Sequence, residues 1–212
     1  MATLGVAGAL GAIALLQDLT GFGVLDAAVA GTLTTADAEA FDTLFGNIGL
    51  AQSAAYVACA VAFLAWLSRS VDNVERLGGG KPAFTPTMSI VWWFVPFANF
   101  VMPHQIVADL YRRMAPAERI SSAIVLGWWV FFLGGNLAAN IAGRVWAGGS
   151  DIETFRTGLQ LYALSDLTDP IAALLAIRIV LSIQRWADAR AAQPALPTDG
   201  TDPQREPSVA LA

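Results

Sequence analysis

Three stretches of this 212-residue sequence contain no Asp, Glu, Lys or Arg, and each is long enough to cross a lipid bilayer. They are residues 43–68, 82–108 and 120–143, of 26, 27 and 24 residues. A membrane-spanning helix needs about 20 predominantly apolar residues. Only 14% of the residues are charged, so a soluble bundle would lack the side chains that cover a soluble surface. The sequence therefore predicts an all-α integral membrane bundle.

Five apolar segments follow one another along the chain, at about residues 4–30, 43–67, 86–103, 120–145 and 154–182. The first is expected to be a retained helix and not a signal peptide, because no Lys or Arg precedes it. An acidic loop is expected at 31–42, and a polar helical extension at 68–77 that the following glycines end. Residues 191–212 are rich in Pro, Ala, Asp and Thr and are expected to be disordered, which leaves 1–190 for the bundle.

The basic residues distinguish two topologies, because cytoplasmic flanks of membrane helices carry an excess of Lys and Arg. If the third segment crosses, giving five spans, ten flanking basic residues divide five against five. If it turns back, only Arg144 and Arg156 lie outside, and eight lie inside: Arg69, Arg76, Lys81, Arg112, Arg113, Arg119, Arg185 and Arg190. The charges favour four spans plus a re-entrant or interfacial segment, with both termini cytoplasmic. Five spans remain the alternative.

Two prolines make a turned-back third segment physically reasonable. Pro96 and Pro103 each remove a backbone donor, and broken helices are tolerated at membrane depth where they are buried in protein or line a cavity. Asn99 lies between them and is expected to satisfy backbone groups that Pro96 frees. The constellation predicts either a cavity-lining break or a structural kink held by an amide side chain.

The second and third segments resemble a bacterial family called domain of unknown function 4328. A Trp-Leu-x-Arg-x-x-x-Asn stretch ends one helix, and a Trp-Phe-x-Pro-x-x-Asn-x-x-x-Pro stretch builds the next. The residues that match these patterns are Trp66, Leu67, Arg69, Asn73, Trp93, Phe94, Pro96, Asn99 and Pro103. The resemblance is close over residues 63–113, and it implies a multi-pass bacterial membrane protein without implying an activity.

Three carboxylates fall near the middle of apolar segments: Asp18 in the first, and Asp166 and Asp169 in the fifth. The last two are three residues apart and share a helix face. An ionised carboxylate facing lipid is costly, so all three are expected to point into the bundle, at similar depth. They predict a proton- or cation-binding site, or else interhelical hydrogen bonds and capping around a break at Asp169-Pro170.

Two further groups are expected to serve anchoring and packing. Arg69 and Asn73 share a face beyond Trp66, which fits lipid-phosphate or partner binding as well as ordinary interfacial anchoring. Small residues and amides on the fourth segment are expected to bring helices close together, within the bundle or in a homodimer: Gly135, Asn136, Ala139, Asn140 and Gly143.

Enzyme motifs are not evident in the sequence. It has no phosphate-binding loop, zincin motif or nucleophile elbow, and its single His104 has no Cys or His near it for zinc. We therefore expect no catalytic residues, metal or cofactor. The single Cys59 excludes a disulfide within one chain, and no basic patch suggests nucleic acid.

Three functions remain open at this stage. The favoured one is a non-enzymatic scaffold or regulatory membrane bundle, whose partners are the lipid bilayer and a second copy or another membrane protein. The alternative is a small transporter or channel that uses the carboxylates to bind protons or cations. An intramembrane enzyme is less favoured. The expected location is the bacterial plasma membrane.

Overall fold

The computed structural model describes residues 2–116 and 121–193, and all regular secondary structure within them is helical. The elements are α1 (Ala2–Val29), α2 (Thr35–Asn73), α3 (Pro86–Val91), η1 (Ala98–Phe100), α4 (Met102–Met114), α5 (Ala123–Gly148) and α6 (Ile152–Ala191). The predicted all-α fold is confirmed for this part of the chain. The disordered tail predicted for 191–212 lies almost wholly outside the described residues.

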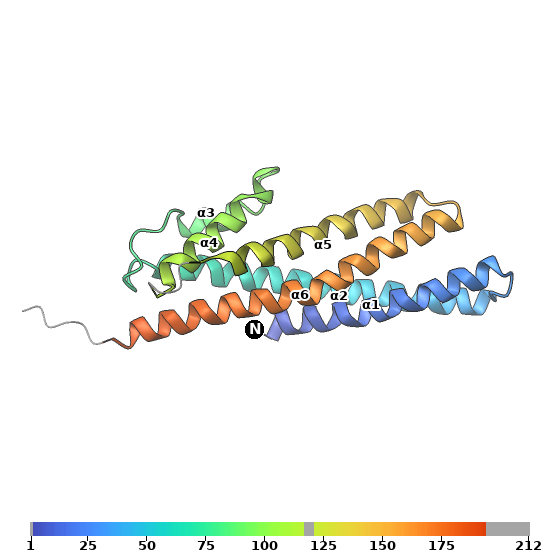
Figure 1. Cartoon of the computed structure of the whole chain (residues 1–212), viewed down its shortest axis with the longest axis horizontal. Coiled ribbons are helices and arrows are strands. Elements are labelled where there is room, and N and C mark those ends of the chain that lie inside the picture. The colour runs from blue at the N-terminus through green and yellow to red at the C-terminus, as the bar shows by residue number, and fades with distance from the viewer. Residues whose placement is uncertain (1, 117–120, 194–212) are drawn as a thin grey trace, which may run out of the picture.

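Four long helices, α1, α2, α5 and α6, run side by side and alternate in direction (Figure 1). Helix α6 packs along both α1 and α5, whereas α2 lies along α1 and α3. Among the described helices, α1, α2 and α5 are long and apolar enough to cross a membrane, and α6, which contains Asp166, Asp169 and Arg178, is not one of those three.

Helix α2 begins eight residues earlier than expected, so the acidic loop predicted for 31–42 is wrong over 35–42. The physical reason is a cap. The Thr34 hydroxyl accepts a hydrogen bond from the Asp37 amide at 3.1 Å and donates one to the Asp37 carboxylate at 2.6 Å. This satisfies one of the free N–H groups of the first turn, and a carboxylate there suits the helix dipole.

The chain between α2 and α5 leaves one end of the bundle and returns to it, forming a hairpin of α3, η1 and α4 (Figure 1). At its base, the Ala83 amide donates to the Asp109 carboxylate at 3.1 Å, and the Arg113 guanidinium donates to the Gly79 carbonyl at 3.4 Å. The residues before α3 therefore lie beside the last turns of α4. The segment 86–114 turns back and does not run the length of the bundle.

The turn of this hairpin is held differently from the sequence expectation. Helix α3 ends at Val91, and Phe97 has a φ of 63°, which reverses the chain just after Pro96. The indole N–H of Trp129 on α5 donates to the Phe100 carbonyl at 2.9 Å. Asn99 Oδ1 is buried without a hydrogen-bond partner, so this oxygen does not satisfy a backbone N–H of the turn. A neighbouring helix satisfies the broken backbone, as is common in membrane proteins.

Helix α6 continues through Pro170, so the break expected at Asp169-Pro170 is absent. Pro170 has no N–H, which leaves the Asp166 carbonyl without its usual helical partner. Close packing against α1 accompanies this position. A Cβ on Gly11 would lie 3.2 Å from the Asp169 Cβ and 3.4 Å from the Pro170 Cδ.

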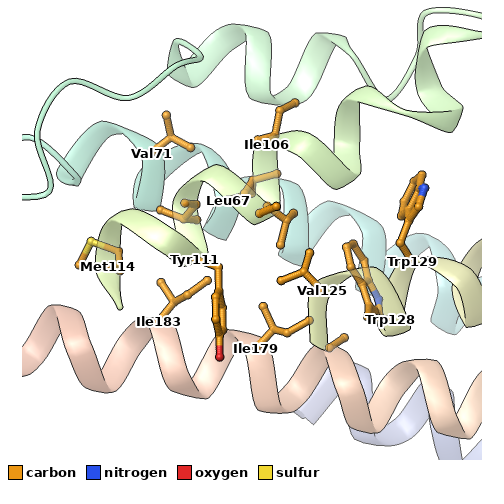
Figure 2. Close-up of a cluster of buried hydrophobic side chains, with 14 of the residues drawn as sticks. Leu67, Val71, Ile106, Tyr111, Met114, Val125, Trp128, Trp129, Ile179 and Ile183 are labelled. Carbon is orange, nitrogen blue, oxygen red and sulfur yellow. The ribbon is translucent and has the colours of Figure 1, made fainter. Parts of the chain in front are cut away.

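The hydrophobic core lies at the end of the bundle that holds the hairpin, and α4 is its centre. Figure 2 shows side chains of α4 meeting those of α2, α5 and α6. Fully or nearly fully buried members are Leu67 and Val71 of α2, Ile106, Val107, Leu110 and Met114 of α4, Val125 and Trp128 of α5, and Ile179 and Ile183 of α6. Helix α4 thus fills the space between α2 and the α5–α6 pair at this end.

The opposite end is closed by aromatic side chains. The Phe45 ring of α2 lies 5.4 Å from that of Trp146 on α5 and 5.6 Å from that of Tyr162 on α6, centroid to centroid. Between these two ends α2 reaches α5 and α6 by side chains, and its backbone packs on α1. The middle of the bundle is therefore its least filled part.

The position of the core gives a first prediction. Leu67→Ala is expected to lower the free energy of unfolding by about 2 to 5 kcal/mol, because the fully buried side chain leaves a cavity among α2, α4 and α5. Leu50→Ala on the same helix, where the side chain is 71% exposed, is expected to change it by less than about 0.5 kcal/mol. Denaturant unfolding in detergent micelles measures both, and equal losses would contradict this core.

Candidate functional site

Two adjoining cavities occupy the middle of the bundle. One has a volume of about 540 Å³ and is lined by carboxylate, amide and hydroxyl side chains; we call it the carboxylate cavity. The other has a volume of about 280 Å³ and is lined mainly by aromatic and aliphatic side chains; we call it the aromatic cavity. The two share Ala7, Tyr56, Asn136 and Asp169 as wall residues.

The three carboxylates singled out in the sequence all line the carboxylate cavity. Asp18 of α1 is 2% exposed and Asp166 of α6 is 8% exposed. Their carboxyl groups lie side by side, in contact that becomes a hydrogen bond when one of them carries a proton. Asp169 lies one helical turn beyond Asp166 and also borders the aromatic cavity. The structure thus brings residues of the first and last helices to one place.

The hydrogen bonds of this carboxyl pair are incomplete. The side-chain amide of Gln52 on α2 donates to Asp166 Oδ1 at 2.8 Å. Asp18 Oδ2 is buried and has no hydrogen-bond partner. A buried carboxylate oxygen without a donor is costly, so this atom is suited to a proton or a bound cation.

Glycines allow the helices to approach closely around these carboxylates. A Cβ on Gly135 of α5 would lie 2.5 Å from the Thr168 hydroxyl and 3.2 Å from Asp169 Oδ1. Gly143 faces the Tyr162 hydroxyl on α6, 3.4 Å from where its Cβ would be. Small residues predicted to pack helices therefore bring α5 against the carboxylate-bearing face of α6.

The described part of the chain places no positively charged side chain against the carboxylates within the cavities. Among the described residues that line either cavity, none is Lys, Arg or His. The described His, Cys, Asp and Glu side chains also do not form a group of three or more that could hold a metal ion. The arrangement suits a proton, a monovalent cation or an organic cation better than a chelated divalent metal.

Two wall residues of α2 were missed in the sequence. Gln52 contacts Asp166, and the Tyr56 hydroxyl donates to Asn136 Oδ1 on α5 at 3.3 Å. They are four residues apart in the uncharged stretch of α2, so they share one face of the helix. This four-residue spacing of polar side chains is the sequence feature that could have identified Gln52 and Tyr56 as wall residues. Asn136, expected to bond across helices, is the partner of Tyr56.

The motif residues shared with the family lie mostly away from the cavities. Trp66 packs on the Phe63 ring at 5.5 Å, while Arg69 and Asn73 are exposed at the hairpin end of α2. Pro96, Asn99 and Pro103 shape the hairpin and line neither cavity.

Trp93 and Phe94 are the motif residues that reach the site, because both line the aromatic cavity. The Trp93 ring lies 5.6 Å from that of Phe63 on α2, 5.9 Å from that of Trp129 and 6.2 Å from that of Phe132 on α5. Cys59 lines the same cavity as a free thiol. His104 lies on α4, where burial and then the positive charge of Arg112 hold its pKa below the usual range.

Comparison with known proteins identifies the family of this chain but assigns it no activity. No curated protein and no solved structure matches the chain. A family model described as "Domain of unknown function (DUF4328)" matches residues 30–185. The match contains Gln52, Asn136, Asp166 and Asp169, whereas Asp18 lies on α1, ahead of it. Since this match covers well over half of the sequence, the chain belongs to the domain of unknown function 4328 family, as its helix-end and hairpin motifs indicated.

Proposed function

We propose that this chain is a multi-pass membrane protein that binds a proton or a cation in its carboxylate cavity, as a small transporter or channel does. The observation that carries the proposal is the Asp18–Asp166 pair, in which Asp18 Oδ2 is buried without a partner. Ionisable residues inside membrane helices are costly and usually mark ion or proton pathways. Asp169 extends the acidic surface toward the second cavity.

The proposed membrane arrangement has four spans, α1, α2, α5 and α6, with the α3–α4 hairpin re-entrant or interfacial. The ends of α2, α4 and α6 meet at one end of the bundle, where the Arg190 guanidinium donates to the carbonyls of Leu77 and Arg113. Of the eight basic residues assigned to this end, all but Arg119 lie within the described chain. By the positive-inside rule we propose that this end is cytoplasmic, with both termini there. The bacterial plasma membrane is the location that we propose with this orientation.

The opposite end fits an external location. It carries Arg144 and Arg156, and the Arg156 guanidinium forms an ion pair with Asp26 at 2.6 Å. Helices α2 and α6 have 39 and 40 residues, about twice the number that a span requires. Their ends therefore project beyond the hydrocarbon region, and the exposed apolar side chains between them face lipid or a partner helix: Leu50, Val57, Val61, Leu164, Leu167 and Leu174.

A passive scaffold, the function that the sequence favoured, has no need of this cavity. Helix packing alone is served by apolar contacts, small residues and paired polar side chains such as Tyr56–Asn136. The buried carboxyl pair links α1, α2 and α6, but its unpartnered oxygen adds a cost that helix packing alone does not require. A cation-binding role accounts for that cost.

Flux through the carboxylate cavity is the second prediction. The wild-type protein in liposomes is expected to carry proton or sodium flux above that of empty liposomes. The double substitution Asp166→Asn and Asp169→Asn is expected to reduce that flux by about tenfold or more, because both amides lack the charge that binds a cation. An internal pH-sensitive or sodium-sensitive dye, read under an imposed gradient, measures it.

The matched control is Asp72→Asn, the same chemical change at an exposed carboxylate whose partner Arg76 is 3.7 Å away. It is expected to leave flux unchanged. Size-exclusion elution of each variant checks that the bundle is intact. Absence of flux in the wild type, or flux in the double variant equal to that of Asp72→Asn, would rule out transport and return the scaffold function to first place.

Topology is the third prediction. In a Cys59→Ala background, single cysteines are placed at Asp37, Glu75 and Pro116, which are all exposed. An impermeant maleimide is expected to label Asp37→Cys on intact bacterial cells, and to label Glu75→Cys and Pro116→Cys only after permeabilisation. Labelling of Pro116→Cys together with Asp37→Cys on intact cells would mean that the third segment crosses the membrane and that five spans are correct.

A further inference from the structure

The aromatic cavity adjoins the carboxylate cavity and adds an apolar space to it. Its walls include the rings of Phe63, Trp93, Phe94, Trp128 and Phe132. These rings come from α2, the hairpin and α5. The ring centroids are 5.6 Å apart in the pair Phe63–Trp93, 5.9 Å in Phe63–Trp128 and 6.2 Å in Trp93–Phe132. The space that they enclose continues to the shared wall at Tyr56, Asn136 and Asp169.

We propose that the two cavities form one binding site for an organic cation with an apolar body, such as a hydrophobic amine or quaternary ammonium compound. The inference rests on the proposed cation-binding function and names the class of ligand. The ammonium group occupies the carboxylate side of the shared wall near Asp169, and the apolar body lies among the rings of the aromatic cavity.

Charge selects a cation. Three carboxylates border the combined space, and the described residues around it include no basic side chain. Asp18 is 2% exposed, has an unpartnered Oδ2 and lines the same space as Asp166 and Asp169, so this buried oxygen independently points to a proton or a positively charged ligand. An anion or a neutral lipid chain would leave these groups without compensation.

The second cavity selects an apolar body. A proton or an alkali cation is satisfied by the polar groups of the carboxylate cavity alone and leaves about 280 Å³ of aromatic-walled space without a role. Small-molecule sites are mostly apolar, with a few polar groups that fix orientation, and typically measure roughly 300–1,000 Å³. Together the two cavities fall within that range.

The aromatic walls also suit a cation directly. The faces of Trp, Tyr and Phe attract ammonium groups through the ring quadrupole, and Trp is the strongest of the three. Trp93 and Trp128 border the aromatic cavity, and Tyr56 borders both cavities. An ammonium group at the shared wall therefore meets carboxylates on one side and ring faces on the other.

The test uses two probes of nearly the same shape. Benzyltrimethylammonium carries a permanent charge, and neopentylbenzene replaces its nitrogen with carbon and is neutral. Binding of each to the full-length protein in lipid nanodiscs is followed by tryptophan fluorescence, with empty nanodiscs as the partitioning control. Comparing each variant with wild type for the same probe removes differences in partitioning.

Asp169→Asn is expected to weaken benzyltrimethylammonium binding by about tenfold or more, through loss of the charge at the shared wall, and to leave neopentylbenzene binding within about twofold. Phe132→Leu is expected to weaken benzyltrimethylammonium binding by about two- to thirtyfold, which is the range expected for loss of a cation–π contact. Asp72→Asn is expected to change neither probe. Phe132→Leu keeps an apolar side chain of suitable size, so folding is retained.

Three outcomes overturn the inference. If benzyltrimethylammonium binds no better than neopentylbenzene, or if Asp169→Asn affects both probes equally, the site does not distinguish an organic cation from a neutral molecule of the same shape. If proton or sodium flux depends on Asp166 and Asp169 while the quaternary probe fails to bind, the proposed function stands and this ligand class is wrong. If neither flux nor binding depends on the carboxylates, both proposals fail together.

Discussion

Helix α4 sets the shape of this bundle, because it takes the place between α2 and the α5–α6 pair that direct helix packing would otherwise fill. Its apolar face, with Ile106, Val107 and Leu110, contacts Leu67 of α2, Val125 of α5 and Ile179 of α6. At the far end, the Phe45 ring of α2 stacks on that of Trp146 on α5. Helix α4 at one end and these rings at the other lie between α2 and its neighbours, and between them α2 reaches α5 and α6 only by side chains.

The cavities follow from that separation. Close contact of α1 with α6, through Gly8 and Gly11, and of α5 with α6, through Gly135, makes a tight three-helix layer that carries the carboxylates. Helix α2 covers this layer at a distance, so that Gln52 and Tyr56 reach across by their side chains. A hairpin that sequence reasoning treated as the distinctive feature therefore acts indirectly: it opens the space and supplies Trp93 to its wall, while the polar groups come from the long helices.

Sequence reasoning succeeded where one-dimensional patterns decide the structure and failed where distances between helices decide it. Long runs without charge predicted the helices, and the basic residues favoured a third segment that turns back. The motif residues Trp66 and Trp93 identified the family. The loop over 35–42 was misjudged because a local cap at Thr34 outweighs the acidic composition. Neither cavity was predictable, since each depends on the separation of α2 from α5, which no spacing along one helix encodes.

The partners of the carboxylates show how much of the site one helix adds. The family match begins at residue 30, so α1 contributes Ala7, Ala14, Gln17 and Asp18 from outside it. Without α1, Asp166 would keep its bond to Gln52 and face open space on the side that Asp18 now occupies. A single carboxylate with an amide donor is a satisfied polar group, whereas two carboxyls side by side with one unpartnered oxygen need a positive charge or a proton. The demand for a cation therefore arises from the docking of α1 onto α6, and it is the glycines at 8 and 11 that permit that docking.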